Sequence, residues 1–187
     1  GNICIIIDDF GYTENNLARD FLNLSNDFTI SVIPGKIYSE DIAHMAYKYG
    51  FEVMIHMPME PYNWEKDNKH RYCITDDLTA QEVESVVNKA FIEIPIAQGM
   101  NNHQGSKATE NLELMKYLAR SLKKIDKFFI DSYTSQESKA FITMRQFGVP
   151  TDIRQVFLDN IDHPDSIKSK LDELVELSSI MNYAIGI

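Results

Sequence analysis

Short apolar runs alternate with amphipathic segments along the whole chain, and this pattern predicts a parallel α/β fold. The first run, residues 3–7, has five apolar residues in succession, which is typical of a strand that is buried on both faces. Strict alternation of such strands with helical segments places helices outside a parallel sheet. Seven strands are expected, at residues 3–7, 28–33, 52–55, 97–100, 128–130, 155–158 and 183–187.

Between these runs, apolar residues recur at helical spacing, and local signals mark where several helices begin and end. Thr79 and Glu82 form a capping box. Gly50 and Gly148 each follow a periodic segment and are expected to end its helix, while Pro164 stands at a first-turn position. Helices are therefore expected around residues 17–24, 42–49, 79–90, 112–122, 140–147 and 164–177.

The spacing of the strands favours a barrel. Most successive strand ends are about 22 to 28 residues apart, which is the length of a βα repeat. We expect one domain, residues 1–187, that forms a seven-stranded parallel (β/α) barrel of irregular, TIM-like type. An open doubly wound sheet is the alternative. The one longer gap contains residues 62–77, which we expect to form a loop over the strand ends. This loop is either a lid that contacts the substrate or a surface loop with no functional role.

Composition and charge exclude several classes of protein. The 187 residues are 44% hydrophobic and 25% charged, as in ordinary globular proteins. The net charge of -10 argues against a nucleic-acid partner, because such proteins carry a basic footprint. No apolar stretch approaches the roughly 18 residues that a membrane span needs, and no signal peptide is seen in the printed sequence. Two cysteines do not make a disulfide framework.

Two adjacent carboxylates, Asp8 and Asp9, follow the first apolar run. Ligands of α/β folds bind at the carboxyl ends of the strands, and Gly11 allows a sharp turn there. Neighbouring like charges repel unless a cation or hydrogen-bond donors hold them. The pair is therefore placed to bind a metal or to act as a base beside a ligand, and turn formation or helix capping is the alternative.

Two of the five histidines, His56 and His103, follow the third and fourth apolar runs and so fall on the same rim as the aspartate pair. Two imidazoles and a carboxylate suit a first-row divalent metal that holds a reactive water. A single histidine on a strand is more often structural, so the prediction depends on the coincidence of all these groups. Further polar candidates for substrate contacts at this rim are Glu60, Asn101, Asn102, Ser106, Asp131 and Asp159.

Five segments together resemble the divergent polysaccharide deacetylase family. They occur in the order of the family and cover nearly the whole chain, at residues 5–11, 56–61, 101–106, 129–132 and 156–160. The resemblance implies a seven-stranded (β/α) barrel related to the nodulation-type carbohydrate deacetylases. Those enzymes bind a divalent metal and remove acetyl groups from N-acetylated sugars.

The resemblance also implies roles for individual residues. Asp8 matches the catalytic base and Asp9 a metal ligand. His56 matches the first of two histidines spaced four apart, but the second position holds Glu60. We therefore expect Asp9, His56 and His103 to bind the metal, with zinc as the expected ion and Glu60 as the alternative ligand. Two further deacetylase motifs, an Arg-Pro-Tyr motif after strand four and a Gly-His pair after the last strand, are not found in the printed sequence.

The expected function is that of a metal-dependent hydrolase that deacetylates N-acetylated sugars of a cell-envelope polysaccharide, outside the cytoplasm. Its partner would be a polysaccharide or amino-sugar substrate, and Tyr62, Trp64 and Tyr72 would stack on sugar rings or merely pack against the barrel. The alternative is a glycan-binding or metal-binding envelope protein that has lost turnover, which the missing motifs favour. A glycosidase that uses Asp9 with Asp131 or Asp159 ranks last, because it leaves both histidines unexplained.

Overall fold

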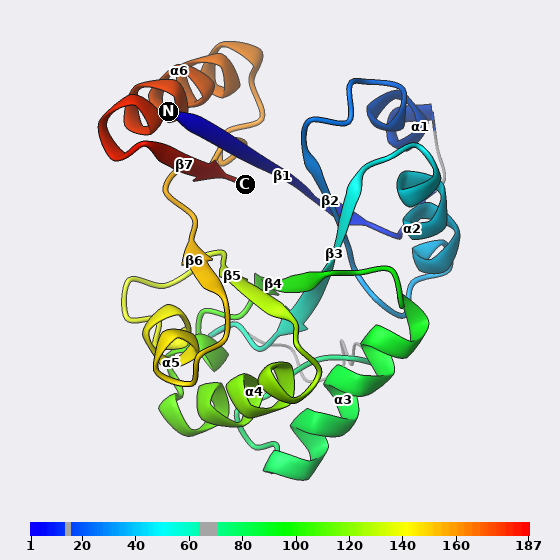
Figure 1. The fold of residues 1–187 in the computed structure, drawn as a ribbon, viewed down its shortest axis with the longest axis vertical. Helices are drawn as coiled ribbons and strands as arrows, with labels where there is room; N and C mark the ends of the chain where they lie inside the picture. The colour runs from blue at the N-terminus through cyan, green and yellow to red at the C-terminus, as the bar shows by residue number, and fades with distance from the viewer. Residues whose placement is uncertain (14–15, 64–70) are drawn as a thin grey trace.

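The computed structural model describes residues 1–13, 16–63 and 71–187, in which parallel strands and helices alternate (Figure 1). The sequence pattern predicted this alternation of strands and helices, but not the short 3₁₀ helix at Ala108–Glu110. The elements are β1 Asn2–Phe10, α1 Asn16–Leu22, β2 Thr29–Val32, α2 Ser39–Lys48, β3 Glu52–Met59, α3 Ala80–Glu93, β4 Gly99–Gln104, the 3₁₀ helix η1 Ala108–Glu110, α4 Leu112–Lys124, β5 Phe128–Asp131, α5 Ala140–Gln146, β6 Thr151–Ile153, α6 Pro164–Met181 and β7 Tyr183–Gly186.

The seven strands form a nearly closed barrel with the helices on its outside (Figure 1). Their order is β6-β5-β4-β3-β2-β1-β7, and every neighbouring pair is parallel. The expected seven-stranded (β/α) barrel is therefore confirmed, and the open doubly wound sheet is wrong. A parallel barrel brings the carboxyl ends of its strands to one rim, where the side chains of a site can meet.

The strand predicted over residues 155–158 was misplaced. The sixth strand is β6, Thr151–Ile153, which pairs with β5. The chain then leaves this ladder at Arg154, and residues 155–158 run beside β7 in irregular pairing. There, the backbone nitrogen of Leu158 donates to the carbonyl of Ile187 at 2.7 Å. Sequence patterning found an apolar segment that does help to close the barrel, but it could not show that the ladder with β5 ends before it.

The third and fourth strands are longer than predicted, so His56 and His103 lie within β3 and β4 rather than after them. The register pairs His56 with Asn101, and Pro58 with His103. Residues two apart on a strand share a face. His56 on one strand, and Asn101 and His103 on the next, therefore belong to adjacent positions on the same face of the barrel wall.

A small apolar cluster fills the barrel beneath the site. Its members come from β1, β3 and β5, which alternate around the barrel, and from β7 and its end, next to β1. Ile6 and Met54 lie two residues before Asp8 and His56 on their strands, so they form the layer directly below those polar side chains. The cluster consists of Ile6, Met54, Ile185 and Ile187, with Phe128 and Ile130 packed against it. A larger cluster lies between the strands and the outer helices.

Helix boundaries follow the predicted local signals. Thr79 caps α3 with both bonds of a capping box to Glu82. Pro164 occupies the first turn of α6, and the side chain of His163 caps that helix. His44 lies on the exposed side of α2, with its Nδ1 bonded to the carbonyl of Glu40. None of the helices among the described residues is long and apolar enough to cross a membrane.

Candidate metal centre

A bulge in β1 turns two consecutive aspartates toward the same place. Neighbouring residues of a regular strand point to opposite faces, but the pairing of β1 with β2 shifts register between Ile7 and Phe10. Within this stretch Asp9 has a φ of 61°, which is uncommon for a residue other than glycine. Gly11 follows with a φ of 119°, so the predicted sharp turn is present. Strained backbone of this kind concentrates at functional sites.

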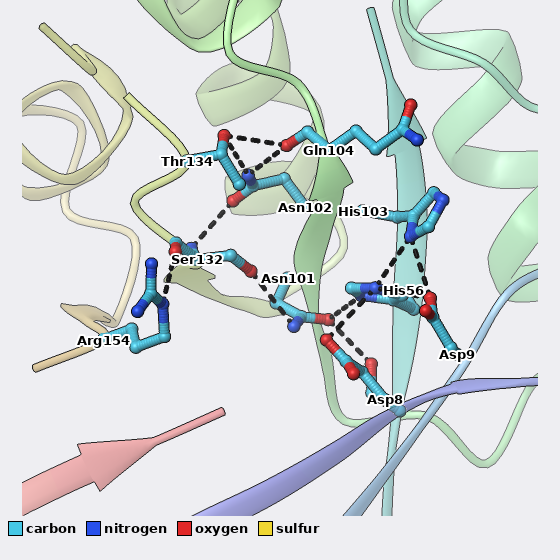
Figure 2. A network of polar contacts seen from close by, with 11 residues as sticks. Asp8, Asp9, His56, Asn101, Asn102, His103, Gln104, Ser132, Thr134 and Arg154 are labelled. Atoms are coloured by element: carbon cyan, nitrogen blue, oxygen red, sulfur yellow. Dashed lines mark hydrogen bonds and ion pairs between the residues drawn. The ribbon is translucent and has the colours of Figure 1, made fainter. Parts of the chain in front are cut away.

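Three side chains from three strands converge at the rim (Figure 2). The Oδ1 atom of Asp9 lies 3.2 Å from Nε2 of His56 and 2.9 Å from Nδ1 of His103. The two imidazole nitrogens are 3.1 Å apart. The second aspartate is adjacent, with Oδ2 of Asp8 at 3.3 Å from Nε2 of His56. The sequence predicted these four residues, and the structure brings all of them together.

The three atoms are arranged as ligands of one ion would be. Zinc binds imidazole nitrogen and carboxylate oxygen at about 2.0–2.2 Å, so two of its ligand atoms lie roughly 3 Å apart. The spacing of Asp9, His56 and His103 agrees with this value. The side chain of Asp9 is 59% exposed, which leaves solvent access for a water or a substrate. The donor set therefore fits a first-row divalent metal.

Asn101 fixes the orientation and tautomer of His56 from below. Its carbonyl oxygen Oδ1 accepts a hydrogen bond from Nδ1 of His56 at 2.9 Å and another from Oγ of Ser31 at 2.7 Å. Because a carbonyl oxygen can only accept, Nδ1 of His56 carries a proton. The lone pair of the neutral ring is then on Nε2, which faces Asp9. Such partners orient metal-binding histidines and are part of the site.

The environment separates the acidities of the two aspartates. Burial raises the pKa of Asp8 above its ordinary value, and the nearby charge of Asp9 adds to the effect. Burial also opposes ionisation of Asp9, but hydrogen bonds with His103 and His56 outweigh it and hold the pKa of Asp9 well below its usual range. Two carboxylates with divergent acidities take different roles. Asp9 suits a permanently ionised ligand, and Asp8 suits a group that exchanges a proton.

The pKa of His56 is raised, although its imidazole is buried. Burial alone lowers the pKa, but the hydrogen bond to Asp9 and the charges of Asp8 and Asp9 outweigh it. A protonated His56 would neutralise part of the charge of the two carboxylates when no metal is bound. A metal ion must displace this proton, so metal binding and proton binding compete at the site.

A pocket of about 240 Å³ opens at this cluster. Two of the residues that the sequence suggested for substrate contacts, Asn102 and Asp159, line it together with the four residues of the cluster. Asn102 is held by its own bonds, because Oδ1 accepts from the backbone nitrogen of Ser132 at 2.8 Å and Nδ2 donates to the carbonyl of Gln104 at 2.7 Å. These bonds hold the side chain of Asn102 between β4 and the segment that follows β5.

The structure places Glu60 outside the metal cluster. Its Oε1 accepts from Nζ of Lys107 at 2.7 Å, and its Oε2 accepts from the backbone nitrogen of Asp76 at 2.8 Å. Lys107 also bonds the carboxylate of Asp76 at 2.8 Å. These contacts tie the end of β3 to the segments that follow β4 and precede α3. The carboxylate of Glu60 anchors loops in this arrangement.

Asp131, Asn101 and Ser106 also lie away from the pocket lining. Asp131 is fully buried, and its carboxylate accepts from the backbone nitrogen of Tyr133 at 2.9 Å and from Oγ of Ser138 at 2.7 Å. It shapes the turn between β5 and α5. An enclosed carboxylate of this kind is not placed to serve as the second group of a glycosidase with Asp9. Oγ of Ser106 accepts from the backbone nitrogen of Tyr62 at 3.2 Å.

The three aromatic residues suggested for sugar stacking have different surroundings. Tyr72 is 3% exposed, its hydroxyl donates to Glu93 at 2.5 Å, and burial raises its pKa to about 12. It packs against the barrel, which was one of the two possibilities. Tyr62 is exposed and bonded to Glu110, and it does not line the pocket. Trp64 lies outside the described residues.

Sequence analysis missed several residues of the pocket. These are Thr134, which follows β5, and Arg154 and Phe157, which follow β6. Ser132, at the end of the predicted fifth strand, was among the polar groups expected at this rim, and the polar run that continues after it was a usable signal for Thr134. Arg154 was missed because the sixth strand was placed at 155–158. The alternation of Thr151-Asp152-Ile153 after Gly148 would have put Arg154 at a strand end.

We expect the variant Asn101→Leu to bind metal about 10–100-fold more weakly, because it removes the acceptor that orients His56. The variant Asn101→Asp keeps an oxygen at that position and should restore most of the affinity. Competition with a chromophoric zinc chelator measures both. Equal affinities in Asn101→Leu and wild type would show that His56 is oriented without this bond. Circular dichroism checks that each variant is folded.

The variant Lys107→Met should lower the melting temperature at neutral pH, and this loss should shrink in acid. The hydrogen bond to Lys107 holds the pKa of Asp76 below its ordinary 3.8. A depressed carboxyl pKa stabilises the fold above pH 3.8, and that stability disappears as the pH falls through the folded-state value. Thermal melts of both proteins from pH 3 to 7 test this. Lys116→Met, which removes the exposed pair with Glu113, is the control and should change little.

Comparison with known proteins identifies the family of the chain and agrees with its fold. The chain belongs to the divergent polysaccharide deacetylase family, whose model matches residues 5–187. The resemblance seen in the sequence is thereby confirmed. Family membership defines the class of protein.

Two relatives have 30% sequence identity with the chain. One is the uncharacterized protein YibQ of Escherichia coli, matched over 178 residues, which are 95% of this chain and 55% of that protein. The other is an uncharacterized protein of Haemophilus influenzae, matched over 185 residues, which are 99% of this chain and 65% of that protein. The chain thus spans between about half and two thirds of the length of these relatives.

A solved structure shows the same fold. It is an uncharacterized protein of Agrobacterium tumefaciens, which superimposes with a TM-score of 0.92 over 99% of this chain and 75% of that one. The sequence identity is 19%, so the likeness supports the barrel architecture and nothing finer.

Proposed function

We propose that this protein is a metal-dependent hydrolase that removes acetyl groups from N-acetylated sugars of a polysaccharide. The observation that carries the proposal is the convergence of Asp9, His56 and His103 within ligand spacing of one another, with Asp8 beside them. Membership of a carbohydrate-acting family supports the substrate class. Placement of the substrate in the cell envelope, outside the cytoplasm, is proposed from the family alone.

Asp9, His56 and His103 would hold the metal, with zinc as the proposed ion. Such an ion, when bound, polarises an amide carbonyl and lowers the pKa of water. The remaining work falls to side chains of the protein. Asn101 and Ser31 keep Nε2 of His56 directed at the site. The barrel interior below the site is apolar, so water is excluded from that side.

Asp8 is the proposed general base. Its carboxylate lies next to the ligand atoms but is not one of the three, and burial raises its pKa toward the range in which a base works near neutral pH. Asp8 takes a proton from water as the water oxygen bonds to the acetyl carbon. The bond between that carbon and nitrogen then breaks, Asp8 returns its proton to the leaving nitrogen, and acetate and a free amino sugar result.

Metal content and acetate release test this proposal. The protein is purified without chelator or a His tag, and its metal is measured by elemental analysis before and after reconstitution with zinc. Acetate release is then followed on chitin oligosaccharides and on peptidoglycan fragments. We expect about one ion per chain and acetate release that chelation abolishes and zinc restores. Failure to bind metal after reconstitution would refute the mechanism, and metal binding without turnover would favour a glycan-binding protein.

A further inference from the structure

The pocket contains one cationic side chain that the proposed hydrolysis does not use. Arg154 is the first residue after β6 and lines the pocket with Asp8, Asp159 and Phe157. Figure 2 shows its side chain next to Ser132, at the edge of the polar network. An arginine is always charged in proteins and presents five N–H donors in a planar fork.

The backbone of the strand ends fixes this guanidinium group in place. Nε donates to the carbonyl of Ser132 at 2.6 Å, and Nη2 donates to the carbonyl of Tyr133 at 3.3 Å. The carbon of the guanidinium lies 4.5 Å from the ring centre of Phe157, which limits its rotation further. Both oxygen partners are neutral. The side chain is therefore held firmly without neutralisation of its charge.

The charge of Arg154 has no close counterion in the part of the chain that the structure describes. Within residues 1–13, 16–63 and 71–187, its guanidinium lies within 4.0 Å of no carboxylate oxygen. Burial lowers the pKa of Arg154, and the carboxylates of Asp131, Asp8 and Asp159, in that order of effect, act on it only at longer range. A partly buried cation is unfavourable unless it is paired. An arginine that served only to balance these aspartates would be expected to contact one of them.

The charge balance of the loaded pocket leaves Arg154 available. Three carboxylates line the pocket, those of Asp8, Asp9 and Asp159. A divalent ion would offset two of these charges and Arg154 would balance the third at long range without contacting it, so the net charge of the loaded pocket would not repel an anion. The N–H groups of Arg154 that have no protein acceptor can then form paired bonds with a carboxylate or phosphate.

Phe157 adds an apolar surface beside the cation. Its ring is 47% exposed and lines the pocket. Exposed aromatic rings offer a face on which a sugar ring can lie. The pocket volume of about 240 Å³ is below the roughly 300–1,000 Å³ of sites for drug-sized ligands, which suits a single sugar residue with one substituent.

We propose that Arg154 and Phe157 form a subsite for an anionic group on the amino sugar, a carboxylate or phosphate attached to or near the N-acetylated ring. This inference rests on the proposed function for the identity of the sugar. It makes Arg154 a specificity-determining residue: acidic N-acetylated sugars should bind better than neutral ones. Phe157 supports the sugar ring while Arg154 binds the oxyanion.

Calorimetric binding titrations of the zinc-loaded protein with three sugars test the subsite. The probes are N-acetylglucosamine, which is neutral, N-acetylmuramic acid, which carries a carboxylate, and N-acetylglucosamine 6-phosphate. We expect at least one anionic sugar to bind about tenfold more tightly than the neutral one. The comparison of the two anionic sugars identifies which oxyanion the subsite accepts.

Variants connect the preference to Arg154. In Arg154→Gln, the anionic preference should disappear while the affinity for N-acetylglucosamine stays within about threefold. Arg154→Lys keeps the charge but loses the planar fork, so it should retain a weaker preference, and it serves if the glutamine variant does not fold. Arg120→Gln is the matched control, because that guanidinium lies over Phe147 and does not line the pocket. It should leave the preference intact.

The outcomes separate this inference from the proposed function. Equal binding of neutral and anionic sugars to the wild type, or a preference that survives in Arg154→Gln, overturns the subsite. If the protein releases acetate from neutral sugars and shows no preference for anionic ones, the proposed hydrolase function is supported and the subsite is rejected. An anionic preference that Arg154→Gln removes, in a protein that releases no acetate from any probe, would retain the subsite and reject the hydrolase.

Discussion

Alanine at Asp9, His56 or His103 is expected to abolish stoichiometric zinc binding. Each substitution removes one of three ligand atoms that lie 2.9 to 3.2 Å apart. Catalytic zinc sites use three protein ligands, and two are too few to retain the ion. Loss of an orienting partner alone costs about 10–100-fold in metal affinity, so we expect loss of a ligand to lower the zinc affinity by more than about 100-fold. Elemental analysis after dialysis against a weak chelator measures the loss in each variant.

Two control variants make this result specific. His44→Ala removes an exposed histidine on α2 whose Nδ1 bonds the backbone carbonyl of Glu40, and it should retain full metal. Glu60→Gln tests the alternative ligand, and it should also retain metal because the carboxylate of Glu60 is occupied by Lys107 and Asp76. Metal lost in His56→Ala and in Glu60→Gln but kept in His103→Ala would contradict the ligand set and assign the third position to Glu60.

Metal binding should also raise the melting temperature of the protein. A ligand that binds only the folded state stabilises it by about 4 kcal/mol at 1,000 times its dissociation constant. Zinc should therefore raise the melting temperature of the wild type and of His44→Ala. The three ligand variants should melt at the same temperature with and without zinc. This measurement separates lost binding from lost folding, because a variant that melts cooperatively is folded.

The polar residues at the rim could be predicted because the sequence indicates both where the buried strands lie and where they end. A continuous apolar run predicts a strand buried on both faces, with its carboxyl end near the polar residue that breaks the run. This reasoning found the ends of the strands that carry Asp8, Asp9 and the two histidines, although it placed these residues after the strands and the structure has them within β1, β3 and β4. The expected burial of the first run on both faces was wrong at its start, because Ile3 and Cys4 are exposed. Convergence followed from the barrel, since its parallel strands end at one rim.

The side-chain directions could not be predicted in the same way. Whether a residue lines a pocket or lies beneath it depends on register, and a shift of one residue moves it to the other face. Asn101 and Asn102 are adjacent in sequence, yet Asn101 is beneath His56 and Asn102 lines the pocket. The bulge that aims both aspartates at one point depends on the left-handed backbone of Asp9, which the sequence does not show.

Because the barrel closes irregularly after β6, sequence analysis did not identify Arg154 and Phe157 as pocket residues. The sixth strand has only three residues, too few for a clear alternation pattern, and the stronger apolar signal lies in the segment after it. Arg154 lies between β6 and this apolar segment, at the point where the chain stops pairing with β5 and begins to bond to β7. Short strands at breaks in a ladder are therefore the places where sequence reading loses functional residues.

Replacement of Asp8 by asparagine is expected to lower turnover by about 10²–10⁴-fold while metal content stays unchanged. The substitution preserves shape but removes the proton acceptor beside the ligand atoms, and Asp8 is not one of the three ligands. Acetate release from the best substrate is measured along with zinc content. The separation of the two readouts is the point of the experiment, because a distorted site would lose both.

The pH profile adds a second, independent readout. Asp8 must be ionised to accept a proton, so the rate should fall as the pH decreases through the pKa of Asp8, which burial raises and a bound cation lowers. The residual activity of Asp8→Asn should lack this fall in rate at acidic pH, the acidic limb of the profile. Asp159→Asn is the matched control, since Asp159 lines the same pocket but does not contact the histidines, and it should keep the limb. Full turnover in Asp8→Asn would move the base to another group, and loss of its metal would make Asp8 a ligand.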